Sequence, residues 1–269
     1  MRLLMCPPIY YGIEYEINPW MRRNEPSDPE VAKEQWRMLS RLLQDEMDVD
    51  VTLAEPIPGL PDMVFTANAG LVWEETFIPS KFRHEVRRGE VAHYEEWFQV
   101  RGYDIVHLPG DDFFEGEGDI LFCGDRFYAG YLIRSEIHPH EKIAEILQHE
   151  VLSLELTNKW FYHLDTCFCP LGGNRAMYYP GAFDSYGVKV IESHISTLVP
   201  VPEAEAMRFA CNAIVDGSNI VMNDGCPEVK SSLEKLGFTV YQTPLSEFIK
   251  AGGSAKCLAL KVPHYEDTD

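Results

Sequence analysis

Hydrophobic residues recur along the chain in a repeating order of short strands and helices. Five β-branched or aromatic runs end shortly before a proline or another turn residue, so they predict strands that close successive units. These runs are residues 49–53, 103–108, 151–156, 197–201 and 238–241. Their spacing, roughly 45 to 55 residues, predicts an internal repeat.

Helices are predicted before several of the closing strands. The segment Ser27-Asp28-Pro29-Glu30 offers a cap, a first-turn proline and a capping-box glutamate, and apolar residues follow at helical spacing as far as Met47. The same spacing predicts helices at residues 86–102, 143–147 and 229–236, and two short helices within residues 180–210. Each unit therefore has the order strand, strand, helix, strand.

Glycine-containing turns predict a hairpin at the start of each unit, at Gly70, Gly124-Asp125, Gly172-Gly173 and Asp216-Gly217. The fifth hairpin has only one evident strand, residues 257–262. Its partner is predicted to be residues 2–5, because this pairing closes a ring and removes an open sheet edge. No linker-like stretch divides the chain, so one domain is expected over residues 1–269.

Composition narrows the classes of function. The chain has 269 residues, of which 45% are hydrophobic, and its formal charge is −20. That charge argues against a nucleic-acid partner and favours either a cationic ligand or simple solubility. The apolar start of the chain stops at Pro7-Pro8, and no run reaches the ~20 residues that cross a bilayer, so we expect a cytoplasmic protein without a membrane partner. Seven cysteines without framework spacing indicate reduced thiols.

Polar residues precede the first strand of each hairpin, and in a ring these positions converge on the axis. They are Asn68, Glu115 with Glu117 and Asp119, His163 with Asp165, Asn212, and Cys257. The convergence predicts one site from scattered residues.

The run at residues 161–169 is predicted to be a strand that places His163, Asp165, Cys167 and Cys169 on one face. An imidazole beside a carboxylate suits proton transfer, whereas the two thiols suggest zinc. Four ligands along one strand lie ~6.6 Å apart per pair, too far for a single ion. We therefore expect no metal, with Cys167 and Cys169 in the core, although a lone packed histidine is also consistent with the pattern.

Cys257 is a candidate nucleophile because Gly252 and Gly253 precede it and let the backbone approach a ligand. The neighbouring Lys256 would favour its thiolate. A small core residue is an equally open interpretation. The run from Glu115 to Asp119 holds three acids, which raise one another's pKa values unless a cation lies among them. It can also be a solvated loop.

Four segments resemble the guanidino-group-modifying superfamily of amidinotransferases and arginine deiminases. They are residues 65–68, 115–122, 163–165 and 252–258, and they follow the family's order over nearly the whole chain. Within this superfamily the chain looks most like the catalytic domain of cyanobacterial-type arginine dihydrolases. The resemblance implies a five-bladed, pseudosymmetric α/β propeller of ββαβ units. It also implies a hydrolase that needs no cofactor, takes a small guanidino substrate and can be a homo-oligomer.

The resemblance also implies roles for individual residues. Cys257 corresponds to the nucleophile, His163 to the general acid and base, and Glu115 and Asp165 to the carboxylates that grip the guanidinium group. The acidic run has an extra residue compared with the deiminase pattern, which leaves Glu117 or Asp119 as alternatives to Glu115.

Further substrate contacts follow from the same resemblance. Arg134 resembles the arginine that pairs with a substrate carboxylate, although a surface arginine is the alternative. Asn18 lies in an aromatic-rich segment expected to act as a lid, and it is expected to contribute a polar contact.

Asn68 stands where deiminases usually have aspartate, and its amide can bind both a guanidinium and a neutral ureido group. We therefore expect L-arginine to be hydrolysed in two rounds, through a cysteine thiouronium intermediate, to ornithine, two ammonia and carbon dioxide. The alternatives are a deiminase or a dimethylarginine hydrolase that gives citrulline, and an arginine-sensing module without turnover.

Overall fold

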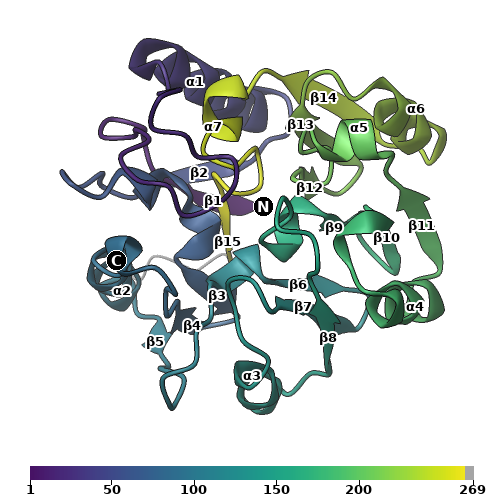
Figure 1. Cartoon of the computed structure of the whole chain (residues 1–269), viewed down its shortest axis with the longest axis horizontal. Coiled ribbons are helices and arrows are strands. Elements are labelled where there is room, and N and C mark those ends of the chain that lie inside the picture. The colour runs from purple at the N-terminus through teal and green to yellow at the C-terminus, as the bar shows by residue number, and fades with distance from the viewer. Residues whose placement is uncertain (264–269) are drawn as a thin grey trace.

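Five three-stranded sheets surround a common axis in the computed structural model, which describes residues 1–263 (Figure 1). This is the five-bladed α/β propeller predicted from the sequence. Of the predicted domain, residues 264–269 lie outside the described part.

Each blade contains two antiparallel strands and a closing strand that runs parallel to the middle one. The first three blades in chain order are β3 (Gly70–Trp73), β4 (Thr76–Pro79) and β5 (Asp104–Ile105); β6 (Ile120–Cys123), β7 (Arg126–Tyr131) and β8 (Val151–Glu155); and β9 (Phe168–Pro170), β10 (Arg175–Tyr178) and β11 (Thr197–Pro200). The fourth is β12 (Ile214–Asp216), β13 (Asn219–Asn223) and β14 (Thr239–Thr243). The fifth joins β15 (Leu260–Val262), β1 (Arg2–Met5) and β2 (Asp50–Leu53).

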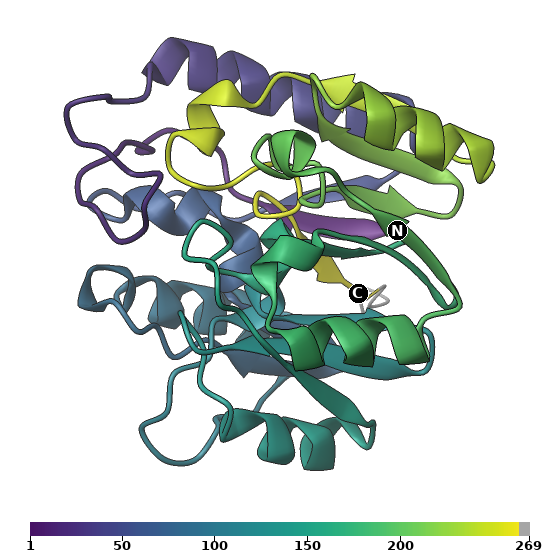
Figure 2. The same ribbon diagram turned by 45° about the vertical axis from the view of Figure 1, so that its right-hand side comes forward.

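In every blade a helix connects the middle strand to the closing strand, and these helices lie on the outside of the ring (Figures 1 and 2). They are α1 (Pro29–Asp45), α2 (Glu90–Gln99), α3 (Pro139–Leu147), α4 (Ser185–His194) and α6 (Pro227–Lys235), with the shorter α5 (Glu203–Ala206) and α7 (Ser246–Ile249) between blades. The two short helices expected within residues 180–210 are therefore α4 and α5. No helix within residues 1–263 is both long and apolar enough to span a membrane.

The start of α1 follows two of its three sequence signals, the cap and the first-turn proline, whereas the predicted capping box is wrong because the Asp28 backbone N–H donates to Glu247 Oε2 and not to Glu30. The Asp28 side chain accepts hydrogen bonds from the backbone N–H groups of Glu30 and Val31, and Pro29 occupies the first turn. The apolar stripe of the helix, which includes Trp36 and Leu39, is buried. The predicted ring closure is also confirmed, because β1 pairs antiparallel with β15 and Leu4 lies opposite Leu260.

Gly70 does not form the predicted hairpin turn. It begins β3, and the turn to β4 lies at Glu74 and Glu75. A Cβ atom at position 70 would collide with the Ile78 carbonyl oxygen and the Phe77 ring. The glycine is thus required by close strand packing, not by a turn. Two 3-10 turns precede Gly70 in the sequence, η1 (Pro61–Val64) and η2 (Thr66–Asn68).

The predicted strand over residues 161–169 is also wrong for most of its length. Residues Leu164–Thr166 form a 3-10 turn, η5, and only β9 is extended. The Thr166 backbone N–H and hydroxyl both donate to the His163 carbonyl oxygen, which closes the turn. His163 and Asp165 consequently do not share a strand face. The segment that was predicted to be one strand is therefore a tight turn followed by a short strand.

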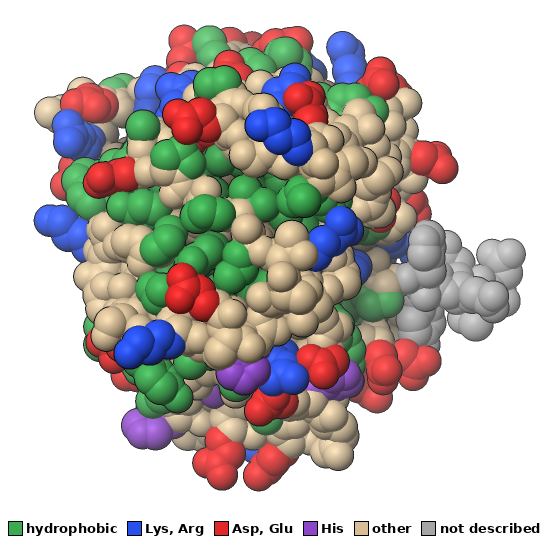
Figure 3. Space-filling view, turned by 90° about the vertical axis from the view of Figure 1, so that its right-hand side faces the viewer, with side chains coloured by type: hydrophobic (Ala, Val, Ile, Leu, Met, Phe, Trp, Pro, Cys, Tyr) green, Lys and Arg blue, Asp and Glu red, His purple; other side chains and the backbone are tan. Residues whose placement is uncertain are grey.

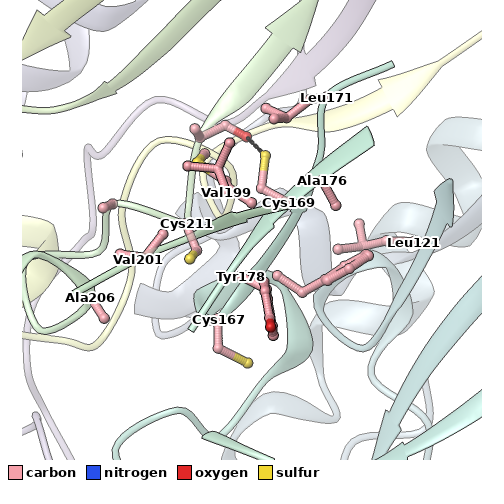
Figure 4. Packing of buried hydrophobic residues seen from close by; sticks show 14 of the residues in the cluster. Leu121, Cys167, Cys169, Leu171, Ala176, Tyr178, Val199, Val201, Ala206 and Cys211 are labelled. Atoms are coloured by element: carbon pink, nitrogen blue, oxygen red, sulfur yellow. Dashed lines mark hydrogen bonds between the residues drawn. The ribbon is translucent and has the colours of Figure 1, made fainter. Parts of the chain in front are cut away.

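Cys167 and Cys169 lie in the largest apolar cluster, as predicted, together with Cys211 (Figure 4). The Cys169 thiol donates to the Ala213 carbonyl oxygen at 3.6 Å. All seven cysteines are free thiols in the structure. On the face that carries β11, α4 and α6, apolar side chains gather between more charged margins (Figure 3).

Candidate active site

The residues predicted to converge do so at the turns that precede the first strand of each hairpin. Asn68 ends η2, Glu115 and Asp119 flank the 3-10 turn η4 (Gly116–Gly118), and Asp165 lies in η5. Cys257 lies in the turn before β15. All these side chains are at most 3% exposed. The pseudosymmetry of the fold therefore brings residues distant in sequence into one buried group.

The thiol of Cys257 is bound on two sides. It donates to Asp165 Oδ2 at 3.2 Å, and Asn212 Nδ2 donates to Cys257 Sγ at 3.1 Å. Burial and the adjacent Asp165 raise the pKa of Cys257 well above its ordinary value. Burial also raises the pKa of Asp165 to about 6. A cation beside this pair would favour the ionised form of both groups.

His163 contacts Glu115, whereas the sequence pattern predicted Asp165 as its neighbour. Its Nε2 lies 2.7 Å from Glu115 Oε2, and both side chains are buried. The other ring nitrogen, Nδ1, is buried without a hydrogen-bond partner among the described residues. This leaves one nitrogen held by a carboxylate and one available for proton transfer.

Glu115 is the carboxylate that contacts His163. Its Oε2 also accepts from Arg134 Nη1 at 2.8 Å, and its Oε1 accepts from the Arg83 backbone N–H at 3.1 Å. Burial alone would raise the pKa of Glu115, but Arg134 and His163 hold it well below its ordinary value. Glu115 is therefore an anion that can stabilise a protonated imidazole.

The other two acids of this run have different partners. Asp119 accepts from Ser135 Oγ at 2.6 Å and from the Leu164 backbone N–H at 3.1 Å, and burial raises its pKa to about 6. Glu117 pairs with Lys256 Nζ at 2.8 Å. Lys256 was expected to stabilise the Cys257 thiolate. Its ammonium group pairs with Glu117 and makes no direct contact with the thiol.

Arg134 is not a surface residue. It is 3% exposed, and besides Glu115 it binds the Ile17 carbonyl oxygen at 3.1 Å and lies 4.7 Å from the centre of the Tyr162 ring. Asn18 follows Ile17 and donates to the Ala251 carbonyl oxygen at 3.0 Å. Its Oδ1 accepts from two backbone N–H groups. The N-terminal segment that holds Asn18 is therefore tied both to Arg134 and to the loop that leads to Cys257.

Arg87 also belongs to the site, although no sequence pattern predicts it there. It stands next to Arg88 in a polar stretch that reads as surface, yet it is only 3% exposed. Its Nη1 donates to Asn68 Oδ1 at 2.9 Å, and its other nitrogens bind both oxygens of Glu90 at 2.8 Å. Asn212 did carry a signal, because it occupies the position before β12 that Asn68 occupies before β3.

Carboxyl groups outnumber cations around these residues. Six buried acids lie here with two buried arginines and the partly buried Lys256: Asp62, Glu90, Glu115, Glu117, Asp119 and Asp165 with Arg87, Arg134 and Lys256. One oxygen of Asp62 and one of Asp165 have no hydrogen-bond partner within residues 1–263. The arrangement is suited to an organic cation. No group of three or more His, Cys, Asp or Glu within the same residues could hold a metal ion.

A cavity of about 450 Å³ lies on the other side of the strand starts. It is lined by later residues of the inner strands, such as Trp73, Phe122 and Val215, and by Lys256 and Glu117. Neither Cys257 nor His163 lines it. The Lys256–Glu117 ion pair therefore lines this mostly apolar cavity, and Lys256 directly precedes the buried Cys257.

The solved structures that match this chain include an arginine dihydrolase and a dimethylarginine dimethylaminohydrolase. The N-terminal domain of ArgZ bound to product, an arginine dihydrolase from the ornithine-ammonia cycle in cyanobacteria, matches with a TM-score of 0.92 and 47% identity over 96% of each chain. A second structure of that domain is covalently bound to a reaction intermediate. A dimethylarginine dimethylaminohydrolase adduct matches with a TM-score of 0.83 at 25% identity. The fold and site therefore define the class of guanidino-group-modifying propellers.

Within that class, the chain belongs to the family described as N,N dimethylarginine dimethylhydrolase, eukaryotic, whose model matches residues 16–263. The chain is 47% identical over 267 residues to the bifunctional arginine dihydrolase/ornithine cyclodeaminase AgrE of Nostoc sp., covering 97% of this chain and 38% of AgrE. It is 37% identical to the N(G),N(G)-dimethylarginine dimethylaminohydrolase of Mycobacterium tuberculosis, covering 97% of this chain and 85% of that protein. The chain thus spans little more than a third of AgrE.

Proposed function

We propose that the protein is an arginine dihydrolase, which hydrolyses L-arginine with two waters to ornithine, carbon dioxide and two ammonia. The observation that carries the proposal is the buried Cys257 thiol between Asp165 and Asn212, in a group of residues with an excess of carboxyl groups. The 47% identity to AgrE and ArgZ domains supports arginine as the substrate.

In the first round, the guanidinium group is held by Asp165 and Glu115. Its positive charge opposes the effect of Asp165 on the thiol, so the thiolate forms when the substrate binds. Sγ attacks the guanidinium carbon, the bond from carbon to a terminal nitrogen breaks, and His163 protonates the departing ammonia. His163 then takes a proton from water, which attacks the thiouronium carbon and releases Sγ.

In the second round, the citrulline formed is attacked again at the same carbon. Asn68 carries this step in the proposal, because a neutral amide can donate to the ureido oxygen as well as accept from an N–H group. The second ammonia then leaves, and hydrolysis of the adduct gives ornithine and carbon dioxide. We assign to Arg134, and with it Asn18, the recognition of the amino-acid end, since a guanidinium fork matches a carboxylate.

Product analysis tests the proposal directly. The purified protein is incubated with L-arginine, and ornithine, citrulline and ammonia are measured over time. Ornithine with two equivalents of ammonia supports the dihydrolase. Citrulline with one equivalent would contradict it and establish a deiminase.

Hydrolysis of methylated arginine is the second candidate, favoured by the family model and by the M. tuberculosis relative of similar length. Release of dimethylamine from N,N-dimethylarginine, without ornithine from arginine, would establish it. An arginine-sensing module without turnover would show equal arginine binding in the parent and in Cys257→Ser, and no ammonia from either.

We expect Asn68→Asp to shift the product from ornithine toward citrulline. A carboxylate at position 68 would form an ion pair with Arg87, whose Nη1 lies 2.9 Å from Asn68 Oδ1, and it would offer the ureido oxygen no donor. The ratio of ornithine to citrulline, measured against parent protein, checks this. An unchanged ratio would contradict the role given to Asn68.

We also propose a cytoplasmic location, since seven free thiols fit a reducing compartment. We further propose that the whole chain forms a single propeller domain.

A further inference from the structure

The side chain of Asn212 touches the sulfur of Cys257 and has no part in the mechanism above. Its Nδ2 donates to Cys257 Sγ and to the Asp165 carbonyl oxygen, both at 3.1 Å. Its Oδ1 accepts from the backbone N–H groups of Ser254 and Cys257, also at 3.1 Å. Both donors and both acceptor sites of the amide are therefore used, and the side chain is fully buried.

These partners fix the direction in which the amide points. If it were rotated by 180°, its NH2 group would face two backbone N–H groups and its oxygen would face the Asp165 carbonyl oxygen. Only the observed orientation pairs every donor with an acceptor. The sulfur of Cys257 is consequently always offered an N–H donor, while its own proton is directed to Asp165 Oδ2.

The backbone around Asn212 adds to this rigidity. Its carbonyl oxygen accepts from the Lys256 N–H at 3.2 Å, and its own N–H donates to Phe209 at 3.0 Å. Phe209 has a φ of 62°, which turns the chain sharply before β12. Asn212 thus binds three N–H groups of the turn that holds the nucleophile, from a neighbouring blade.

We propose that Asn212 is a further catalytic residue, which stabilises the Cys257 thiolate through its Nδ2–H donor and holds the sulfur in place. When the S–H bond breaks without substrate, the proton passes to solvent and the Asn212 N–H stays on the sulfur. A hydrogen bond to an anion is stronger than one to a neutral thiol, so it shifts the balance toward thiolate. Burial and Asp165 act in the opposite direction, raising the pKa of Cys257.

The test is the pH dependence of Cys257 alkylation by iodoacetamide in the full chain without substrate, followed by mass spectrometry of the Cys257 peptide. Asn212→Asp keeps the shape and the acceptor for two N–H groups, but it replaces the donor by an oxygen. We expect its midpoint to rise by about one pH unit or more, and alkylation at pH 8 to slow about ten-fold. Cys257→Ser has no thiol in this peptide and must give no alkylated product, which verifies the assignment of the signal to Cys257.

Asn223→Asp is the matched control. Asn223 is also buried, donates to the carbonyl oxygens of Arg208 and Asp224, and accepts from the Leu245 N–H. It touches no residue of the site, so its variant should lose thermal stability and keep the parent's alkylation profile.

A parent-like profile in folded Asn212→Asp would overturn the proposal. If that variant does not fold, Asn212→Ala removes the donor without adding charge. Slower alkylation then supports the proposal, and an unchanged profile overturns it. Because no substrate is used, failure of the dihydrolase assignment leaves this result unaffected.

Discussion

Two buried carboxyl groups of the site have opposite pKa shifts because their neighbours differ. Glu115 lies against Arg134, which holds its pKa below the ordinary value, although burial acts the other way. Within residues 1–263 no cationic side chain lies within hydrogen-bond distance of Asp165, and burial raises its pKa to about 6. At neutral pH the charge of Asp165 therefore opposes folding while it favours the binding of a cation.

We expect Asp165→Asn to stabilise the fold at pH 7.5 and to abolish ammonia release. The folded pKa of Asp165 is raised from 3.8 to about 6, so its contribution to stability is present below pH 4 and is lost as pH rises through 6. The gain at pH 7.5 is on the order of 1–3 kcal/mol, and it should vanish near pH 4.

Urea unfolding of parent and variant at both pH values measures this gain. Asp104→Asn, at an exposed position, is the control and should change stability by less than about 0.5 kcal/mol. Equal destabilisation of Asp165→Asn at the two pH values would contradict the effect assigned to burial.

The residues of the site could be predicted where each one begins a repeat unit, as Cys257, His163 and Asn68 do. The pairing of these residues could not. The pattern predicts His163 beside Asp165. Because the segment forms a 3-10 turn, the His163 ring instead contacts Glu115 and the Asp165 carboxyl group contacts the Cys257 thiol. Arg87 was missed altogether, since burial of an arginine depends on tertiary partners such as Glu90 that no local pattern reveals.

At the scale of elements, the site depends on short 3-10 turns placed directly before the inner strands. Turn η4 brings Gly118 so close to η2 that a Cβ atom there would overlap Asn68 Nδ2 and lie 3.3 Å from His163 Nδ1. The lack of a side chain at position 118 thus sets the spacing between two residues of the site.

We expect Gly118→Ala to fold but to lower kcat/KM at least ten-fold, because Asn68 and His163 must both move, and shifts of about 1 Å cost on the order of a hundred-fold. Steady-state kinetics with arginine, together with circular dichroism, checks this. Gly12→Ala is the control, since nothing lies within 4 Å of an added Cβ there. Parent-like kinetics in Gly118→Ala would show that the spacing is not critical.

The sequence predicted helices better than it predicted the turns of the site. Helix α1 begins where its cap residues indicate, because capping is a local interaction between neighbours. The residue pattern from Phe161 to Cys169 predicts one strand, but a turn followed by a short strand has a similar pattern of residues. Gly70 by itself predicts a turn, whereas the structure requires a glycine there because the strand packs closely against Phe77 and Ile78.

At the scale of the whole molecule, the two ends of the chain build one blade. Strand β1 pairs with β15 on one side and with β2 on the other, so the ring closes only when contacts far apart in sequence form. This closure was predictable because a ring of hairpins left one strand near Cys257 without a partner. The nucleophile turn immediately precedes β15, and its position therefore depends on that closure.

We expect Leu4→Ala to cost about 2–5 kcal/mol of stability and to speed native-state alkylation of Cys257. Leu4 is fully buried opposite Leu260 in this joint sheet. Leu53→Ala, in the same sheet but 51% exposed, is the matched control and should change stability by about 0.5 kcal/mol or less. Urea unfolding and iodoacetamide labelling measure the two effects. If Leu4→Ala loosens the fold without speeding the labelling, then the turn of Cys257 is held by Asn212 and its neighbouring blade and not by closure of the ring.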